Sequence, residues 1–328
     1  MDQVSTPQGR PVRLLAAGGT IAMQGEQAVP SLDAGQLIAA IPALQRFSRL
    51  EAENVLGLPG PQISLEQALG VARRAGAAAG SGEGVVITTG TDTLEELAAV
   101  CGLTYGGNAP IVVTGANRPA SAAGADGPAN LFDAVALAAW EGAAGLGVVV
   151  VFGGEIHAGL SARKVDSTGP AAFGSPVAGP IGRVVEGRVW LHARPLRPAP
   201  LAPRTLQHRV PIVTAALGDD GATLRAAAAE ADGIVLVTLG AGHLPPAMLR
   251  ELHAALARVP VVLACRPERG SMLHSTYGFE GAERDLRASG AACAPFLSPV
   301  AARIALLCCL GAGLDRAAIA EALAPWDA

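Results

Sequence analysis

Short apolar runs rich in Val and Ile alternate along the chain with longer Ala-rich stretches. The runs have the length of buried strands, and the Ala-rich stretches between them are typical of helices. Repeated alternation of this kind predicts α/β structure, a doubly wound parallel sheet with helices packed against it. The predicted strands are residues 12–16, 84–88, 111–114, 147–152, 212–215, 234–238 and 261–264.

The segment 191–211 interrupts this alternation. It contains five prolines and no apolar periodicity, which is typical of a linker. The sequence therefore predicts a larger amino-terminal catalytic α/β domain over residues 1–190 and a smaller carboxy-terminal α/β domain over residues 212–328. A chain of 328 residues is long enough for two such domains.

Composition excludes several classes of protein. The chain carries 24 Lys and Arg against 28 Asp and Glu, a net charge of −4, so neither nucleic acid nor an acidic membrane surface is an expected partner. Half of the residues are hydrophobic and 16% are charged, which excludes intrinsic disorder. No uncharged apolar stretch reaches membrane-spanning length, and the first apolar segment is too short for a signal sequence.

The five cysteines show no CxxC spacing and lie among apolar residues. An odd number without motif spacing indicates small core residues rather than disulfides or a metal site. Together with the lack of a targeting signal, this predicts a soluble protein of the reducing cytoplasm.

Ligands of parallel α/β sheets bind beyond the carboxyl ends of the strands. The first predicted strand ends in Gly18-Gly19-Thr20, the second in Gly90-Thr91-Asp92, and the third in a Gly-Ala-Asn-Arg-Pro segment, residues 115–119. The spacing of Thr93 and Glu96 predicts a capping box, which places Thr91 and Asp92 just before a helix. Two threonines and one aspartate are thus expected on one rim.

Lys164 is the only lysine of the chain. An amine, unlike a guanidinium, can release its proton at working pH, so a lone lysine is a candidate for proton transfer. The alternative is a solvated surface residue, just as Thr20 and Thr91 could merely cap helices. The three residues in combination favour a Thr-Lys-Asp relay built from Thr91, Lys164 and Asp92, with Thr20 exposed by its glycine pair as a nucleophile.

Other chemistries lack the required spacing. The P-loop needs a Gly-Lys pair, whereas Lys164 follows Arg163. The six histidines form no HExxH or HxH pair, so no metal is expected, and no serine lies in a G-x-S-x-G elbow. Residues 240–243 match a dinucleotide fingerprint only in part and are equally a ligand loop or a plain turn. Asp126 before Gly127 and Pro128 predicts a helix N-cap.

Taken in order, these segments resemble the bacterial-type L-asparaginase family over nearly the whole chain from Val12. AAGGTIAM is similar to the family's first signature, and VVITTGTDTLEE is similar to the second. TGANRPASAAGADGPANL and GLSARKVDSTGPAAF resemble the segment that follows and the segment with the catalytic lysine.

By this resemblance Thr20 is the nucleophile, while Thr91, Asp92 and Lys164 handle protons. The implied reaction is hydrolysis of a small amino-acid amide, asparagine first, to aspartate and ammonia through an acyl-enzyme, without metal or organic cofactor. The backbone N–H of Ala116 is expected to bind the oxyanion. The resemblance also implies a homodimer or homotetramer, in which an acidic residue, here Glu280 or Glu283, is lent between subunits.

Two departures from the family concern substrate binding. The lid segment MQGEQAVPSLDAGQ is short and has no tyrosine beside the nucleophile. Where the family places a serine and a glutamine that hold the substrate, the chain has Gly60 and Pro61, so Gln62, Ser64 or backbone groups are expected to replace them. Two alternatives remain: a glutaminase-asparaginase of broad small-amide specificity, and a catalytically weak amino-acid-binding protein.

Overall fold

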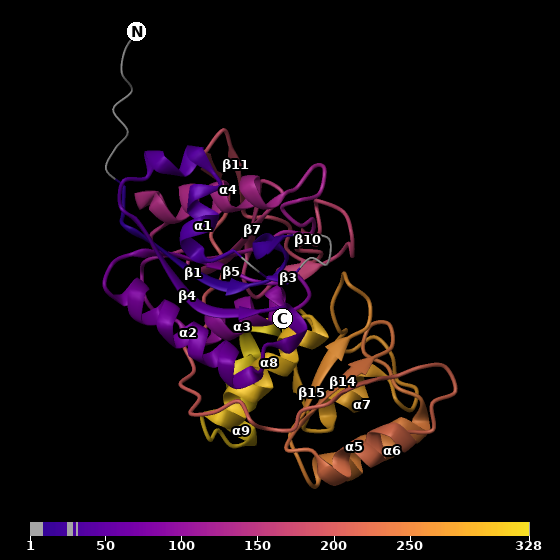
Figure 1. The fold of residues 1–328 in the computed structure, drawn as a ribbon. Helices are drawn as coiled ribbons and strands as arrows, with labels where there is room; N and C mark the ends of the chain where they lie inside the picture. The colour runs from indigo at the N-terminus through magenta and orange to yellow at the C-terminus, as the bar shows by residue number, and fades with distance from the viewer. Residues whose placement is uncertain (1–8, 25–28, 31, 328) are drawn as a thin grey trace. The chain divides into compact units, whose positions relative to one another are not determined.

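The computed structural model describes residues 9–24, 29–30 and 32–327. The chain divides into two compact units, Met1–Arg197 and Pro198–Ala328, which are taken in turn (Figure 1). The predicted domain boundaries at residues 190 and 212 stay a proposal.

The first unit is built on an eight-stranded sheet in the order β12-β11-β8-β7-β6-β5-β1-β4. Its parallel part confirms the predicted parallel α/β sheet, and three antiparallel strands extend it at one edge. The parallel strands are β4 (Leu50–Leu58), β1 (Val12–Gly18), β5 (Gly84–Thr88), β6 (Ile111–Thr114) and β7 (Val148–Phe152), and the antiparallel ones are β8 (Glu155–Ala158), β11 (Gly182–Val185) and β12 (Arg188–Leu191).

Strand β4 is an edge strand that the hydrophobic pattern did not predict. It pairs in parallel with β1, Val12 opposite Leu50, yet several of its side chains are exposed. Glu51 and Glu53 pair with arginines, Arg13 and Arg74. An edge strand with one polar face lacks the continuous apolar run of a buried strand, so pattern reading misses it.

Helices cover both faces of this sheet. Leu14, Val86 and Val112 pack with Leu131 and Ala134 of α4 (Gly127–Ala139) in one apolar cluster. Figure 1 shows α1 (Ala34–Ala39) and α4 on one side of the strands and α2 (Leu65–Gly80) and α3 (Leu94–Thr104) on the other. The predicted doubly wound arrangement is therefore present. The shorter elements of the unit are η1 (Thr20–Ala22), β2 (Met23–Gln24), β3 (Val29–Pro30), η2 (Pro42–Arg46), η3 (Gly60–Gln62), η4 (Glu141–Ala143), β9 (Arg163–Lys164) and β10 (Phe173–Gly174).

The second unit is a smaller α/β layer with four parallel strands in the order β13-β14-β15-β16. Leu236 and Leu263 of the sheet pack with Met248 and Leu252. Its elements are β13 (Ile212–Thr214), α5 (Ala222–Glu230), β14 (Ile234–Thr238), α6 (Pro246–Leu256), β15 (Val261–Cys265), α7 (Glu283–Ala288), β16 (Ala292–Cys293), α8 (Pro299–Gly311), α9 (Arg316–Leu323) and η5 (Ala324–Trp326).

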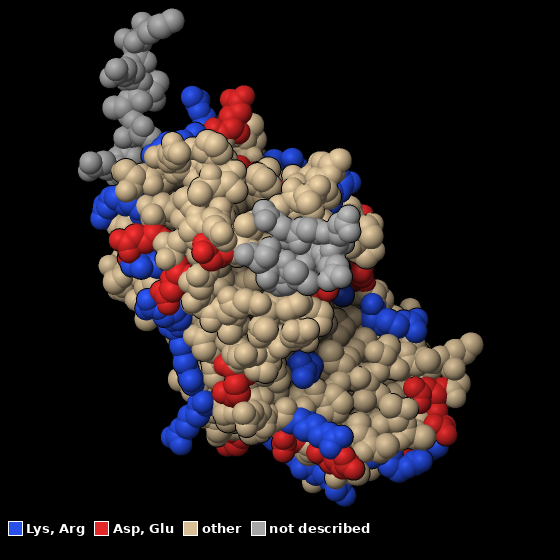
Figure 2. All heavy atoms as spheres, in the orientation of Figure 1, with Lys and Arg blue, Asp and Glu red and all other residues tan. Residues whose placement is uncertain are grey.

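Two further sequence predictions concern residues of both units. All five cysteines are free thiols in buried positions, which confirms that they are core residues. Residues 240–242 form a turn, closed by backbone hydrogen bonds between Leu239 and His243 on either side of it. Across the residues that the structure describes, every helix is too short or too polar to cross a membrane. Figure 2 shows basic and acidic side chains interspersed over the face in view.

Candidate active site

Glycines bring the carboxyl ends of neighbouring strands into backbone contact. Gly19, after β1, has a φ of +82°, and a Cβ added to it would lie 2.2 Å from the backbone N of Gly90, after β5. A Cβ on Gly90 would lie 2.7 Å from the N of Gly60, which follows β4. Only residues without a side chain allow three loops to approach this closely. Thr20 and Thr91 each follow directly on one of these glycines, so both flank the same contact.

A fourth loop joins this cluster from β6. A Cβ on Gly115 would lie 2.6 Å from the carbonyl oxygen of Thr89 and 3.4 Å from Cγ2 of Thr91. The next residue, Ala116, is completely buried, and its Cβ faces Gly127 at the start of α4. The glycine-rich ends of β1, β4, β5 and β6 therefore form one continuous rim, as the sequence predicted for β1, β5 and β6.

Lys164 lies against the proton-handling residues that the sequence proposed. Its ammonium donates to the hydroxyl of Thr91 and to Oδ1 of Asp92, both over 2.9 Å. Thr91 is buried and the Lys164 side chain is 17% exposed, whereas that of Asp92 is 63% exposed. The ammonium thus has one buried partner and one that reaches solvent.

The lysine is carried by a short two-stranded ribbon. Lys164 of β9 pairs with Phe173 of β10, and the backbone N–H of Val165 donates to the carbonyl of Ala172. Glu95, in the first turn of α3, lies against this ribbon. Burial raises the pKa of Glu95, while the Arg163 charge and the backbone N–H of Lys164 oppose that shift. The ribbon is thus anchored to the same helix that begins after Asp92.

The remaining predicted site residues differ in accessibility. Thr20 starts the single-turn η1 and is partly exposed, as a nucleophile requires. Gly60 is buried, packed under Gly90 and beside the hydroxyl of Thr93, while Gln62 is exposed at the end of η3. The predicted lid runs from Met23 to Gln36, and its residues 25–28 and 31 lie outside the described residues.

Both predicted N-cap positions are confirmed, but neither side chain makes a capping hydrogen bond, so the predicted capping box of Thr93 is wrong. Thr93 is the N-cap of α3 but makes no side-chain capping bond, because its φ of −124° and ψ of 12° depart from the extended cap geometry. Asp126 is the N-cap residue of α4, but its side chain makes no capping hydrogen bond either. Its carboxylate instead accepts the backbone N–H groups of Asn117 and Arg118, over 3.0 and 2.8 Å. The Asp126 side chain therefore serves a neighbouring loop rather than its own helix.

Sequence reasoning missed the residues that hold the β6 loop. Asn130 of α4 is 2% exposed, and its amide nitrogen donates to the carbonyl of Gly115 and to Asp126. Its amide oxygen accepts the backbone N–H of Gly153, which follows β7. A buried Asn four residues after an N-cap Asp is the signal that could have found this pair, since a buried amide must be paired.

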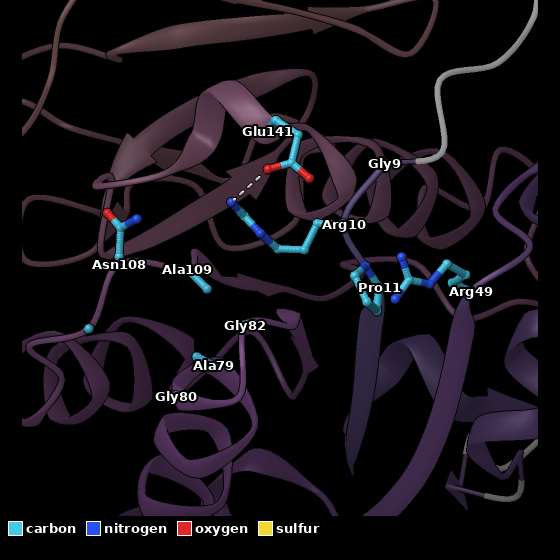
Figure 3. Close-up of a pocket in the computed structure, with 11 residues that line it drawn as sticks. Gly9, Arg10, Pro11, Arg49, Ala79, Gly80, Gly82, Asn108, Ala109 and Glu141 are labelled. Atoms are coloured by element: carbon cyan, nitrogen blue, oxygen red, sulfur yellow. Dashed lines mark hydrogen bonds and ion pairs between the residues drawn. The ribbon is translucent and has the colours of Figure 1, made fainter.

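A cavity of about 480 Å³ opens at the opposite, amino-terminal end of the strands. Figure 3 shows Arg10 pointing across it towards Glu141, with a nitrogen–oxygen distance of 3.3 Å, and Arg49 at its edge. Helices α2 and α4 end beside it, and arginines at helix carboxyl ends compensate the negative ends of the helix dipoles. None of the predicted site residues lines this cavity.

In the second unit the two candidate acidic residues differ sharply. Glu283 is completely buried, and its Oε1 accepts the backbone N–H groups of Thr276 and Tyr277 over 2.6 and 2.7 Å. Its other oxygen lies 3.4 Å from Nε2 of His243. Glu280 is largely exposed and lies 3.8 Å from Arg250. Within the described part of the chain, no three His, Cys, Asp or Glu side chains gather as metal ligands would.

The fold and the rim define an α/β protein with a Thr-Lys-Asp cluster at the carboxyl ends of a parallel sheet. Residues 11–197 match the family model "Asparaginase, N-terminal", and residues 209–323 match "Glutaminase/Asparaginase C-terminal domain". The chain belongs to the asparaginase family of amide hydrolases.

Individual relatives agree with this assignment. A probable L-asparaginase of Deinococcus radiodurans is 37% identical over 311 residues, which cover 92% of this chain and 94% of that protein. A glutaminase-asparaginase of Pseudomonas fluorescens biotype A is 39% identical over 195 residues, 57% of this chain and 54% of that protein. The solved structure of a probable cytoplasmic L-asparaginase from Campylobacter jejuni aligns with a TM-score of 0.85 at 29% identity, covering 96% of this chain and 99% of that one.

Proposed function

We propose that this protein is an L-asparagine amidohydrolase that works through an acyl-enzyme on Thr20. The observation that carries the proposal is the pair of 2.9 Å hydrogen bonds from the Lys164 ammonium to Thr91 and Asp92. A hydroxyl that accepts from an ammonium keeps its own O–H free to donate towards the rim. The full-length similarity to the Deinococcus radiodurans probable L-asparaginase supports asparagine as the substrate.

The proposed reaction has two steps. The Thr20 oxygen attacks the side-chain carboxamide carbon, the C–N bond breaks, and the nitrogen leaves as ammonia after receiving the threonine's proton. Water then attacks the ester, releases aspartate and restores the Thr20 hydroxyl. Thr91, Lys164 and Asp92 relay the protons in both steps, with the exposed Asp92 exchanging with solvent.

The oxyanion formed in each step requires donors on the rim. Backbone N–H groups near Thr20 and Ala116 fill this role in the proposal. Ala116 itself is buried just after the end of β6. Exposed Gln62 and the backbone at Gly60 bind the α-amino and α-carboxylate groups.

Release of ammonia from a panel of amino-acid amides tests the proposal. L-asparagine should be hydrolysed by the wild-type chain, and the Thr20→Ala variant, measured alongside, should release none. Comparable turnover of glutamine would favour the broad glutaminase-asparaginase, which the partial match to the Pseudomonas fluorescens glutaminase-asparaginase supports. Calorimetric binding of these amides without ammonia release would identify the catalytically weak binding protein instead.

The proposal extends to assembly and location. A homodimer or homotetramer fits the family implication that one subunit lends an acidic residue to the next, and light scattering that finds an active monomer would contradict it. The named cytoplasmic L-asparaginase from Campylobacter jejuni supports the cytoplasm as the site of action. A relative from Haemophilus influenzae is named periplasmic, so fractionation of the producing cell is the measurement that separates the two.

A further inference from the structure

The loops that carry the proposed chemistry are joined in a closed ring of contacts. Lys164 bonds to Thr91 on the β5 side, and Thr91 packs against Gly115 at the end of β6. After the lysine in sequence, the turn at residues 166–169 contacts the loop that follows β6. That return contact is a single hydrogen bond, in which the side-chain nitrogen of Asn117 donates to the carbonyl of Gly169 over 2.7 Å.

The turn next to Lys164 is closed by its own hydrogen bonds. Oδ1 of Asp166 accepts the backbone N–H groups of Thr168 and Gly169, both over 2.8 Å. These N–H groups lower the pKa of the Asp166 carboxyl, so it stays ionised and keeps the turn closed. Lys164, in β9, comes two residues before Asp166 in the sequence. A contact that fixes Gly169 therefore fixes the end of the segment from which the lysine reaches Thr91.

Asn117 is also held in place at its backbone. Asp126 accepts the N–H groups of residues 117 and 118, and buried Asn130 holds both Asp126 and the carbonyl of Gly115. The Asn117 side chain thus projects from a fixed backbone to a fixed turn. When both partners of a hydrogen bond are already held in place, the bond fixes the position of one group relative to the other. Little side-chain motion then remains that would let the two groups shift apart.

We propose that Asn117 is a positioning residue, whose amide sets the Lys164 ribbon against Thr91 through the Asn117–Gly169 hydrogen bond. The inference rests on the proposed function, because it assigns Lys164 and Thr91 to proton transfer. Asn117 acts through the turn and the lysine, so it changes the rate of turnover more than the binding of substrate.

Two substitutions separate this role from a merely structural one. Asn117→Met removes the donor and leaves an uncharged side chain one atom longer, and we expect kcat to fall about three- to tenfold with KM changed less than twofold, the effect of losing one hydrogen bond. Asn117→Asp places an ionised carboxylate against the Gly169 carbonyl at neutral pH. Once protonated, the same carboxyl donates a hydrogen bond to that carbonyl.

The activity of Asn117→Asp relative to the wild-type protein should therefore rise as the pH is lowered from about 7.5 to about 4, towards the ordinary aspartate pKa of about 3.9, because the facing carbonyl favours the protonated carboxyl. The ratio for Asn117→Met should stay flat over the same range. Matched controls are Asn108→Met and Asn108→Asp, at an exposed asparagine beside the distant cavity, and both should keep wild-type kcat and a flat ratio. Thermal melting of every variant checks that each is folded.

Wild-type kcat in Asn117→Met together with a flat ratio in Asn117→Asp would overturn the inference. If Asn117→Met does not fold, the pH ratio of Asn117→Asp decides alone, and a flat ratio contradicts the proposal. Thr91→Val and Lys164→Met are measured in parallel. Turnover that survives in those two variants would refute the proton-relay part of the proposed function, whereas their inactivity beside unaffected Asn117 variants refutes only the positioning role.

Discussion

The Lys164 ammonium lies 2.9 Å from the hydroxyl of Thr91, a residue 73 positions earlier in the chain. Lys164 is also the only lysine among 24 basic residues of the Lys and Arg type. The one amine of the chain is thus held at the hydroxyl that the proposed relay needs. A guanidinium could occupy the same place and keep the same charge but could not give up its proton.

Lys164→Arg should therefore abolish turnover although the positive charge is retained. Arginine keeps its proton throughout the working pH range, so it cannot take part in a relay that requires a neutral amine. Ammonia release from L-asparagine measures the effect. Retention of more than about a tenth of wild-type turnover would contradict the proton-relay role.

Thr20→Ala and Thr91→Val should each remove hydrolysis while the protein stays folded. Each change deletes one hydroxyl and little core volume, so the free energy of unfolding should fall by at most about 2 kcal/mol. Denaturant unfolding checks the stability, and a coupled ammonia assay checks the activity. The acyl-enzyme proposal fails if Thr20→Ala turns over asparagine at a rate near that of the wild-type protein.

Gly19→Ala should both destabilise the protein and inactivate it. A Cβ at residue 19 would overlap the backbone of Gly90, and the φ of +82° is strained for any L side chain. We expect a loss of about 2–4 kcal/mol in the free energy of unfolding. Gly70→Ala is the matched control, because Gly70 lies inside α2 with nothing within 4 Å of an added Cβ. That variant should gain about 0.5–1 kcal/mol and keep full activity.

Asp133 should make stability depend on pH. Burial raises the pKa of this α4 carboxyl to about 6, above its ordinary value of 3.8. The folded state therefore binds a proton that the unfolded state has released between these two values, and stability falls as the pH rises through that window. Asp133→Asn should accordingly raise the melting temperature at pH 8 and leave it unchanged near pH 3.5. Equal stabilisation at both pH values would show that the gain does not come from titration of Asp133.

Kinetics should show a high KM and weak discrimination between small amides. The Met23–Gln36 segment has no tyrosine, and the family resemblance implies two polar, substrate-holding side chains where the chain has Gly60 and Pro61. Each missing charge-assisted contact costs about 1.5–3 kcal/mol of binding. Steady-state measurements with L-asparagine and L-glutamine test this expectation. A micromolar KM with strict selectivity for asparagine would mean that other groups replace those contacts fully.

Hydrophobic pattern predicted the buried strands well but not the edge of the sheet. Strand β5 was predicted with its observed bounds, because a strand buried on both faces must be apolar throughout. Strand β4 and the antiparallel β8, β11 and β12 escaped prediction, since strands with one solvated face carry charged residues such as Glu53 and Arg183.

By itself, the sequence determined the α/β class, the glycine-threonine rim and the single lysine as the candidate relay residue. These follow from local apolar runs, from glycines that free the backbone, and from composition. Only the tertiary structure decided that Lys164 contacts both Thr91 and Asp92, that the Asp126 carboxylate binds the loop at residues 117 and 118, and that Asn117 bonds to Gly169. A side-chain hydrogen bond between residues far apart in the chain depends on where packing places their backbones, and that position has no counterpart in local sequence pattern.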